Sequence, residues 1–345
     1  MSDLDTPTMA SLLFNLALFL SFATFSFRTP VAAGDDGSQV SASVPPLIYV
    51  YKNGTIIRPL DQRKLPASPQ DQATGVYSRD ITIPGNIPAR IYLPKLQTAS
   101  EKLPILIWYH GGGFCMGSAF ASGDHQFLNI LASKAKIVAI SVDYRLAPEH
   151  LLPAAYDDSW AAVKWVASHA PGSIRPEKPD PVLLQHGDFS RIFLGGDSSG
   201  ANIVHNMVVK TGKEQLPGKN TKIFGGILTH PFFWGSKDGD KESFGYKDWS
   251  FVYPAAPGGI DNPLINLFSE PLSGYRASRI FVSIAEQDGL KVKGMDYVKV
   301  VNGSGWRGEL KVVEVLGVGH SFYLNHIHST KAYFLIAQIV KFICH

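Results

Sequence analysis

The strongest constraint on the fold of this chain is a serine set between glycines, in the pentapeptide Gly-Asp-Ser-Ser-Gly at residues 196–200. An apolar run, Arg191 to Gly195, precedes it, and a segment with helical spacing follows it. A serine on such a strand-to-helix turn has its hydroxyl forced out above the sheet, and bulky neighbours would collide with the backbone. The motif therefore predicts that Ser198 is a nucleophile. On such a turn Asp197 points elsewhere, so we expect it to have a structural role.

The rest of the chain alternates between apolar runs and helical segments. The expected strands are Ile105–Tyr109, Ile137–Val142, Ile192–Leu194, Ile223–Leu228, Ile280–Ile284 and Leu310–Val315, and the expected helices include Ala154–His169, Ser199–Thr211 and Lys331–Ile343. Continuous apolar runs are typical of strands buried on both faces, and their alternation with helices predicts an α/β fold with a mainly parallel sheet. Leu47–Tyr51 and Arg90–Leu93 are expected to be antiparallel edge strands.

A glycine run follows the first of these apolar strands, in the sequence His-Gly-Gly-Gly-Phe at residues 110–114. Consecutive glycines let backbone N–H groups face one point, which is the geometry that holds a developing negative charge. A phosphate-binding loop would need a following Lys with Ser or Thr, or a G-x-G-x-x-G pattern, and neither is present. We therefore expect the N–H groups of Gly112, Gly113 and Ser199 to form an oxyanion hole.

A serine nucleophile needs a histidine base and a carboxylate that orients the base. His320 follows the strand Leu310–Val315, and Asp288 follows Ile280–Ile284, so the order along the chain is Ser, Asp, His. Glu286 is the alternative acid, two residues before Asp288 on the same loop. Of the 11 histidines, only His320 stands at the expected place.

Composition excludes several other classes of protein. Lys and Arg number 32 against 29 Asp and Glu, a net charge of +3, which is too even for a nucleic-acid binder. Two cysteines, Cys115 and Cys344, provide neither a disulfide framework nor a zinc motif. With 345 residues, 45% of them hydrophobic, the chain is able to bury a sizeable core.

The amino terminus contains an uncharged apolar segment, Leu12–Phe27. It is shorter than the roughly 20 residues that span a bilayer, and a small-residue stretch, Val31–Ala33, follows it. Residues 1–33 are therefore interpreted as a signal peptide, with a cytoplasmic extension as the alternative, and no stable membrane span is expected. If the chain enters the secretory pathway, Asn53 and Asn302 stand in glycosylation sequons.

Taken together, these motifs resemble the plant carboxylesterases of the hormone-sensitive-lipase group. The resemblance covers roughly Pro45–Cys344 and rests on residues 110–114, 143–149 (DYRLAPE), 153–158 (PAAYDD), 196–202 (GDSSGAN) and 319–320 (GH). It implies an eight-stranded α/β-hydrolase sheet with helices on both faces, a helical cap and no cofactor. The family's acid loop commonly reads Asp-x-Leu-Arg-Asp, whereas Lys291 and Val292 follow Leu290 here.

The domain prediction is one α/β-hydrolase domain over residues 34–345. Two stretches, about 34–88 and 232–268, interrupt the alternation of strands and helices, and we expect them to form the cap, because long irregular segments in a compact domain are usually lids or binding loops.

The functional prediction is a serine carboxylesterase that hydrolyses small or medium apolar esters through an acyl-enzyme. Ser198, Asp288 and His320 are the expected catalytic residues, and a small-molecule ester is the expected partner. Two alternatives stay open: a lyase, dehydratase or cyclase of specialised metabolism that reuses the site, and a non-catalytic receptor for a small molecule. Retention of His320 argues against the receptor. The oligomeric state is left open.

Overall fold

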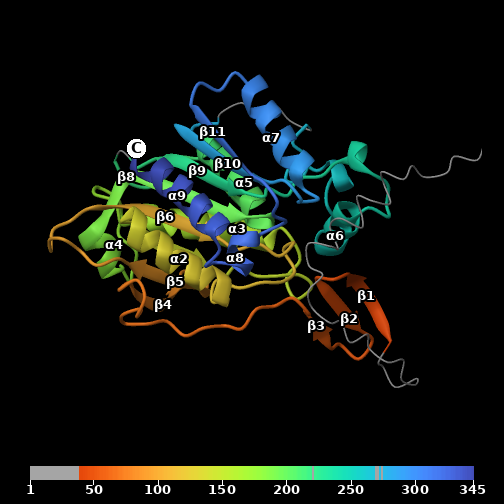
Figure 1. The fold of residues 1–345 in the computed structure, drawn as a ribbon, viewed down its shortest axis with the longest axis horizontal. Coiled ribbons are helices and arrows are strands. Elements are labelled where there is room, and N and C mark those ends of the chain that lie inside the picture. The colour runs from red at the N-terminus through yellow and green to blue at the C-terminus, as the bar shows by residue number, and fades with distance from the viewer. Residues whose placement is uncertain (1–38, 220, 269–271, 273–274) are drawn as a thin grey trace, which may run out of the picture.

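The fold is centred on an eight-stranded sheet, seen in a computed structural model that describes residues 39–345 except 220, 269–271 and 273–274 (Figure 1). Its strand order is β11-β10-β9-β8-β6-β7-β5-β4. The strands are β4 (Tyr77–Ile83), β5 (Ile87–Leu93), β6 (Leu103–Tyr109), β7 (Val138–Val142), β8 (Gly187–Asp197), β9 (Ile223–Thr229), β10 (Arg279–Ala285) and β11 (Glu309–Val315). Pairing is parallel from β11 to β7 and antiparallel between β7, β5 and β4. The expected α/β-hydrolase sheet is therefore confirmed.

Helices cover both faces of this sheet. The helices α2 (Ser122–Ala135), α8 (Phe322–Asn325) and α9 (Thr330–Cys344) pack together against one face. The helices α3 (Ala154–Ala167), α5 (Ser199–Lys213) and α7 (Lys291–Gly303) belong to the core of the other face, and the short α4 (Pro181–His186) precedes β8. Every residue of β6 and β7 is buried, as their continuous apolar sequences predict.

A second, smaller unit lies beside the main sheet (Figure 1). It consists of an antiparallel sheet of β1 (Val40–Val44), β2 (Ile48–Tyr51) and β3 (Ile56–Ile57), together with α6 (Phe244–Val252), which packs against β1. Two short 3₁₀ turns, η1 (Ser236–Asp238) and η2 (Gly259–Asp261), flank α6. We call β1–β3 and residues 232–268 the cap segments. Much of the expected helical cap is thus a small sheet.

Two expectations for the start of the main sheet were wrong. The stretch of about 34–88 was expected to be irregular up to its end, but β4 lies at 77–83 and pairs along its length with β5. Arg90–Leu93 is not at an edge, because β5 lies between β4 and β7. The charged Arg90 made the strand look like an exposed edge strand, but its side chain is only 1% exposed. Its Nε pairs with the Asp80 Oδ1 of β4 at 2.7 Å.

The expected strand Leu47–Tyr51 appears as β2, and Ile105–Tyr109 and the five strands expected after it appear as β6 to β11, with ends shifted by a few residues. Leu310–Val315 is correct in position, but β11 is an edge strand and most of its side chains are exposed or half-buried. The expected signal segment, residues 1–33, lies outside the described residues. Across the described residues, every helix is too short or too polar to span a membrane.

Candidate active site

Ser198 stands on a strained turn between β8 and α5. Its φ is 55° and its ψ is −116°, a conformation that L-residues rarely adopt and that a strand-to-helix nucleophile turn requires. The turn is tight, because a Cβ on Gly196 would lie 2.4 Å from the carbonyl carbon of Gly200. The Ser198 N–H donates to the Thr229 carbonyl at the end of β9, which holds the turn to the neighbouring strand at 2.9 Å. The geometry presents the serine at the carboxyl edge of the sheet.

His320 and Asp288 form the imidazole–carboxylate pair of the site. The His320 Nδ1 lies 2.8 Å from the Asp288 Oδ2, so the ring nitrogen donates to the carboxylate. The other Asp288 oxygen accepts from the Leu290 N–H at 2.8 Å, which orients the carboxyl group. Burial alone would lower the pKa of His320, but the charge of Asp288 and its hydrogen bond raise that pKa to about 9. The pKa of Asp288 is lowered, because the charge of His320 outweighs the burial of the carboxylate.

Asp197, next to the serine, is buried and accepts several hydrogen bonds. Its Oδ1 accepts from the hydroxyls of Thr229 and Tyr323 at 3.1 Å each and lies 3.1 Å from the His230 Nδ1, and its Oδ2 accepts from the Ser321 hydroxyl. Burial would raise the pKa of Asp197, but the hydrogen bond and charge of His230 and the charge of His320 lower it. Because Ser321 follows His320, this carboxylate joins the turn of Ser198 to the loop of the histidine.

A second histidine, His230, lies beside this pair. Its ring centroid is 5.5 Å from that of His320. One ring nitrogen each of His230 and His320 and one carboxylate oxygen of Asp288 all lie within 4.8 Å of one another. Sequence reasoning gave His230 no role in the site, because only His320 stood at the expected place. The residue has φ 47° and donates its N–H to the Ser283 carbonyl, so β10 holds it beside Asp288. The signal in the sequence was its position directly after β9, at the same sheet edge as the other site residues.

The glycine loop after β6 runs directly beside the serine. A Cβ on Gly111 would lie 3.3 Å from the Ser198 Cβ. The N–H groups of Gly112, Gly113 and Ser199 donate no hydrogen bond to any acceptor in the described part of the chain. Free N–H groups on the loop and at the first residue of α5 can stabilise a negative oxygen beside Ser198.

The cap contributes one more buried carboxyl, which sequence reasoning did not single out. Asp248 on α6 is fully buried, and its Oδ1 would be 2.8 Å from a Cβ on Gly113. The Leu47 Cδ1, from the turn between β1 and β2, would be equally close. The oxyanion loop is therefore enclosed by both cap segments. Nothing in the sequence near Asp248 distinguishes it from an exposed helix residue.

The predicted residues fall into one arrangement. Asp288 and His320 are in direct contact, while Glu286 accepts instead from the Gly317 N–H at 2.7 Å and does not bond His320. Ser198, Gly112, Gly113 and Ser199 lie at the same carboxyl edge of the sheet. A hydroxyl, an imidazole–carboxylate pair and free N–H groups are the set that nucleophilic attack at a carbonyl needs, although no hydrogen bond joins Ser198 to His320 among the described residues.

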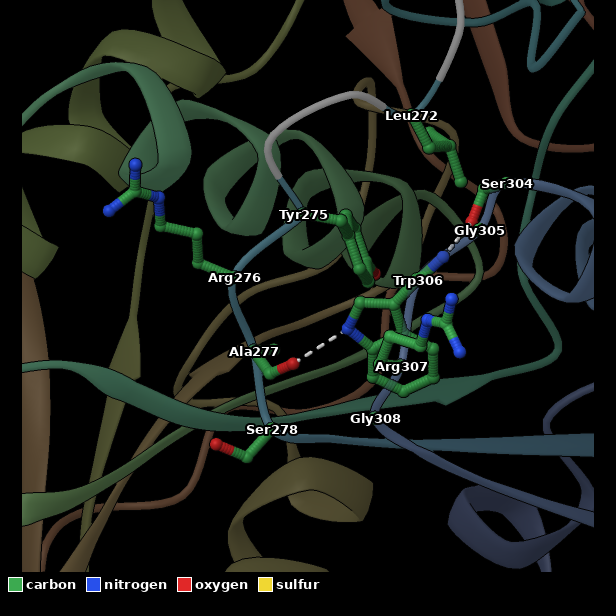
Figure 2. Close-up of a pocket in the computed structure, with 10 residues that line it drawn as sticks. All are labelled: Leu272, Tyr275, Arg276, Ala277, Ser278, Ser304, Gly305, Trp306, Arg307 and Gly308. Carbon is green, nitrogen blue, oxygen red and sulfur yellow. Dashed lines mark hydrogen bonds between the residues drawn. The ribbon is translucent and has the colours of Figure 1, made fainter.

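A hollow on the described surface lies away from this site (Figure 2). It has a volume of about 590 Å³ and is formed by Leu272 and by residues 275–278 and 304–308, which precede β10 and β11. The Trp306 indole donates to the Ala277 carbonyl at 2.8 Å, and Figure 2 shows Arg276 pointing away from that indole. Because Asp288 and His320 follow the opposite ends of these strands, this hollow is separate from the site.

Comparison with known proteins agrees with the fold and the site. Residues 106–324 match the family described as alpha/beta hydrolase fold. The 2-hydroxyisoflavanone dehydratase of Glycyrrhiza echinata is 45% identical over 88% of this chain and 96% of its own length. Probable carboxylesterase 13 of Arabidopsis thaliana is 39% identical over 89% of this chain and 98% of its own. The esterase of Pyrobaculum calidifontis has a TM-score of 0.61 and 25% identity, covering 78% of this chain and 85% of its own.

These similarities confirm the expected resemblance and support the expected enzyme class, a carboxylic ester hydrolase. They also include an enzyme named for a dehydration on the same fold. The substrate and the reaction that this chain favours are thus a separate question from its fold.

Proposed function

The chain belongs to the α/β-hydrolase family, and from that premise we propose that it is a serine carboxylesterase acting on small or medium apolar esters. The observation that carries the proposal is the 2.8 Å hydrogen bond between His320 and Asp288, beside a serine held at φ 55°. A hydrolase needs this pair because a serine hydroxyl is a weak nucleophile until a base takes its proton. A receptor that only binds its ligand has no such requirement.

The proposed reaction has two halves. The Ser198 Oγ attacks the ester carbonyl carbon while His320 takes its proton, and the N–H groups of Gly112, Gly113 and Ser199 stabilise the oxyanion. His320 then gives the proton to the leaving alcohol, and the acyl group stays on Ser198. In the second half water attacks the acyl-enzyme, again with His320 as base, and releases the acid. Asp288 holds the ring of His320 and stabilises its protonated form.

The raised pKa of His320 has a consequence for this mechanism. A base must be neutral to accept a proton, and at neutral pH an imidazole with a pKa of about 9 is mostly protonated. We therefore expect kcat/KM in the free enzyme to rise as pH increases, with a half-maximal value near pH 9.

The test is hydrolysis of p-nitrophenyl butyrate by the wild type and by Ser198→Ala. We expect the substitution to lower kcat by about 10⁴-fold or more, as removal of a serine nucleophile does elsewhere. Ser250→Ala, an exposed serine on α6, serves as the matched control. A folded wild type that hydrolyses no ester, or a Ser198→Ala variant that keeps full activity, would contradict the proposal.

A dehydratase is the second candidate, and the 45% identity to a 2-hydroxyisoflavanone dehydratase favours it. An elimination can use the same oxyanion hole and the same base, because it also develops negative charge on a carbonyl oxygen. Incubation with 2-hydroxyisoflavanone, followed by mass spectrometry for the loss of water, separates the two. Dehydration with negligible ester cleavage would replace the esterase proposal.

A further inference from the structure

The cap places an unpaired carboxyl group in the interior of the protein. Asp248 has no exposed surface, and neither of its carboxyl oxygens has a hydrogen-bond partner within the described residues. A buried polar group without a partner destabilises a fold by roughly 1–3 kcal/mol, and more if it is charged. A leucine of similar size would fill the position at no such cost. Asp248 therefore needs an explanation other than stability.

Two groups that interact electrostatically with Asp248, Tyr156 and Cys115, already have other partners. The Tyr156 hydroxyl donates to the Asn202 Oδ1 at 2.7 Å, and the thiol of Cys115 donates to the Gly112 carbonyl at 3.6 Å. The Arg58 guanidinium donates to the Cys115 carbonyl at 2.6 Å and pairs with Glu149 at 2.6 Å. Among the described residues, no group donates a hydrogen bond to Asp248. Burial raises its pKa well above the usual range and so favours the neutral carboxylic acid over the carboxylate.

The position of Asp248 relates it to the reacting carbonyl. Its carboxyl group packs directly on Gly113, the residue whose N–H is expected to hold the carbonyl oxygen of the substrate. Trp249, the next residue of α6, packs its ring edge-on against Phe114 with centroids 6.4 Å apart, which fixes the helix against the loop. A group on the substrate that pairs with Asp248 would therefore lie a few ångströms from the bond that breaks.

We propose that Asp248 is a specificity-determining residue that hydrogen-bonds a hydroxyl group of the substrate, close to the reacting carbonyl. The proposal deepens the esterase function and rests on it for the placement of the carbonyl. A hydroxyl both donates and accepts, so it satisfies both oxygens of a carboxylic acid without a net charge in the interior. An ammonium group would require two buried charges beside the apolar side chains of Leu47 and Phe114. The preferred substrate is then a hydroxylated ester.

The experiment compares matched substrates that differ in one hydroxyl. Wild type, Asp248→Leu and Asp248→Asn are assayed with p-nitrophenyl butyrate and with its 2-hydroxy and 3-hydroxy counterparts. We expect the wild type to prefer at least one hydroxylated ester by about tenfold in kcat/KM, because a site built for a hydroxyl disfavours the analogue that lacks it. Asp248→Leu is expected to abolish that preference, and Asp248→Asn, whose amide also donates and accepts, to keep part of it. Lys247→Ala, an exposed neighbour on α6, controls for disturbance of the helix.

Thermal unfolding separates specificity from a structural role. Asp248→Leu is expected to raise Tm, because it removes an unpaired polar group from the interior. A lower Tm for Asp248→Leu, or the same substrate preference in this variant as in the wild type, overturns the proposal.

Binding to Ser198→Ala keeps this test independent of turnover. The variant is mixed with each of the three esters, and the rise in Tm reports binding. In Ser198→Ala, we expect the preferred hydroxylated ester to raise Tm more than p-nitrophenyl butyrate does. In the double variant Ser198→Ala/Asp248→Leu, we expect all three esters to raise Tm equally. If the wild type hydrolyses none of the esters but this difference appears, the esterase function fails and the hydroxyl subsite stands. Equal rises in Ser198→Ala itself overturn the subsite.

Discussion

Two buried aspartates differ in their hydrogen bonding: Asp197 lies next to the nucleophile Ser198, and Asp248 lies against the glycine loop at Gly113. Asp197, at the strand ends, is 2% exposed and accepts hydrogen bonds from the hydroxyls of Thr229, Tyr323 and Ser321. Asp248, in the cap, is 0% exposed and accepts none from the described residues. The pKa of the first is lowered in spite of burial, and the pKa of the second is raised by burial.

This difference suggests that the strand ends and the cap have different functions. The strand-end region is complete before any substrate arrives, because the protein itself supplies every partner of its carboxylates. Such preorganisation is what stabilises a transition state, since no group has to reorganise during the reaction. The cap region leaves one hydrogen-bonding group unpaired, so part of its complementarity has to come from the ligand. Chemistry and selectivity are thus placed in different elements.

The largest expected effect comes from breaking the strand-end pair itself. Asp288→Asn keeps the shape but leaves His320 in the wrong tautomer and without its counter-charge, so kcat is expected to fall by about 10⁴-fold. The pKa of His320 is also expected to fall, because the charge of Asp288 raises it. Steady-state kinetics across pH measures both, with Glu286→Gln as the control for the neighbouring acid. A loss of less than tenfold would show that Asp288 does not orient the base.

The contact between the two regions is tested at Gly113. An alanine there places its Cβ 2.8 Å from the Asp248 Oδ1, and φ is +58°, so the loop has to shift. We expect kcat to fall by about 10²- to 10³-fold, the usual loss when an oxyanion donor is displaced. Gly259→Ala is a matched control, because Gly259 has nearly the same φ, +59°, and nothing lies within 4 Å of its Cβ position. Equal losses in both variants would assign the effect to backbone strain alone.

A smaller effect is expected from neutralising Asp197. Its charge contributes to the raised pKa of His320, so Asp197→Asn should lower that pKa and move the rising limb of the pH profile to lower pH. We expect a loss of about tenfold in kcat at the optimum, because the catalytic pair itself remains. Asp158→Asn, which breaks the ion pair between the buried Asp158 and the exposed Arg145, is the control and should leave the pH profile in place. If the rising limb of the pH profile does not move in Asp197→Asn, the charge of Asp197 does not contribute to the pKa of His320.

The smallest effect is on stability, at Asp248. We expect Asp248→Leu to raise Tm by about 2 °C or more at pH 8, because removing an unpaired polar group is worth roughly 1 kcal/mol. Since folding raises the pKa of Asp248, the wild type loses stability as pH rises above the carboxyl's unfolded pKa of about 3.9. The gain in Tm should therefore be larger at pH 8 than at pH 4, as calorimetry would show. A gain that does not depend on pH would mean that the carboxyl does not titrate on unfolding.

Much of the catalytic side of the molecule followed from the sequence. The parallel strands were found because residues buried on both faces are apolar throughout, as in β6 and β7. The residues at their carboxyl ends, Ser198, Asp288 and His320, were found because such ends meet at one edge of a parallel sheet. The antiparallel start was harder, since β4 alternates polar and apolar residues and β5 contains the buried Arg90.

The sequence by itself determined the sheet and the order of the catalytic residues along the chain, because both depend on local patterns of apolar residues and glycine. Only the tertiary structure decided which side chains share a site across long separations. It brought His230 within reach of Asp288, and it set both Asp248 and Leu47 against Gly113. No local pattern records such contacts, because whether a carboxyl group on a helix meets water or a glycine loop depends on how separate elements pack.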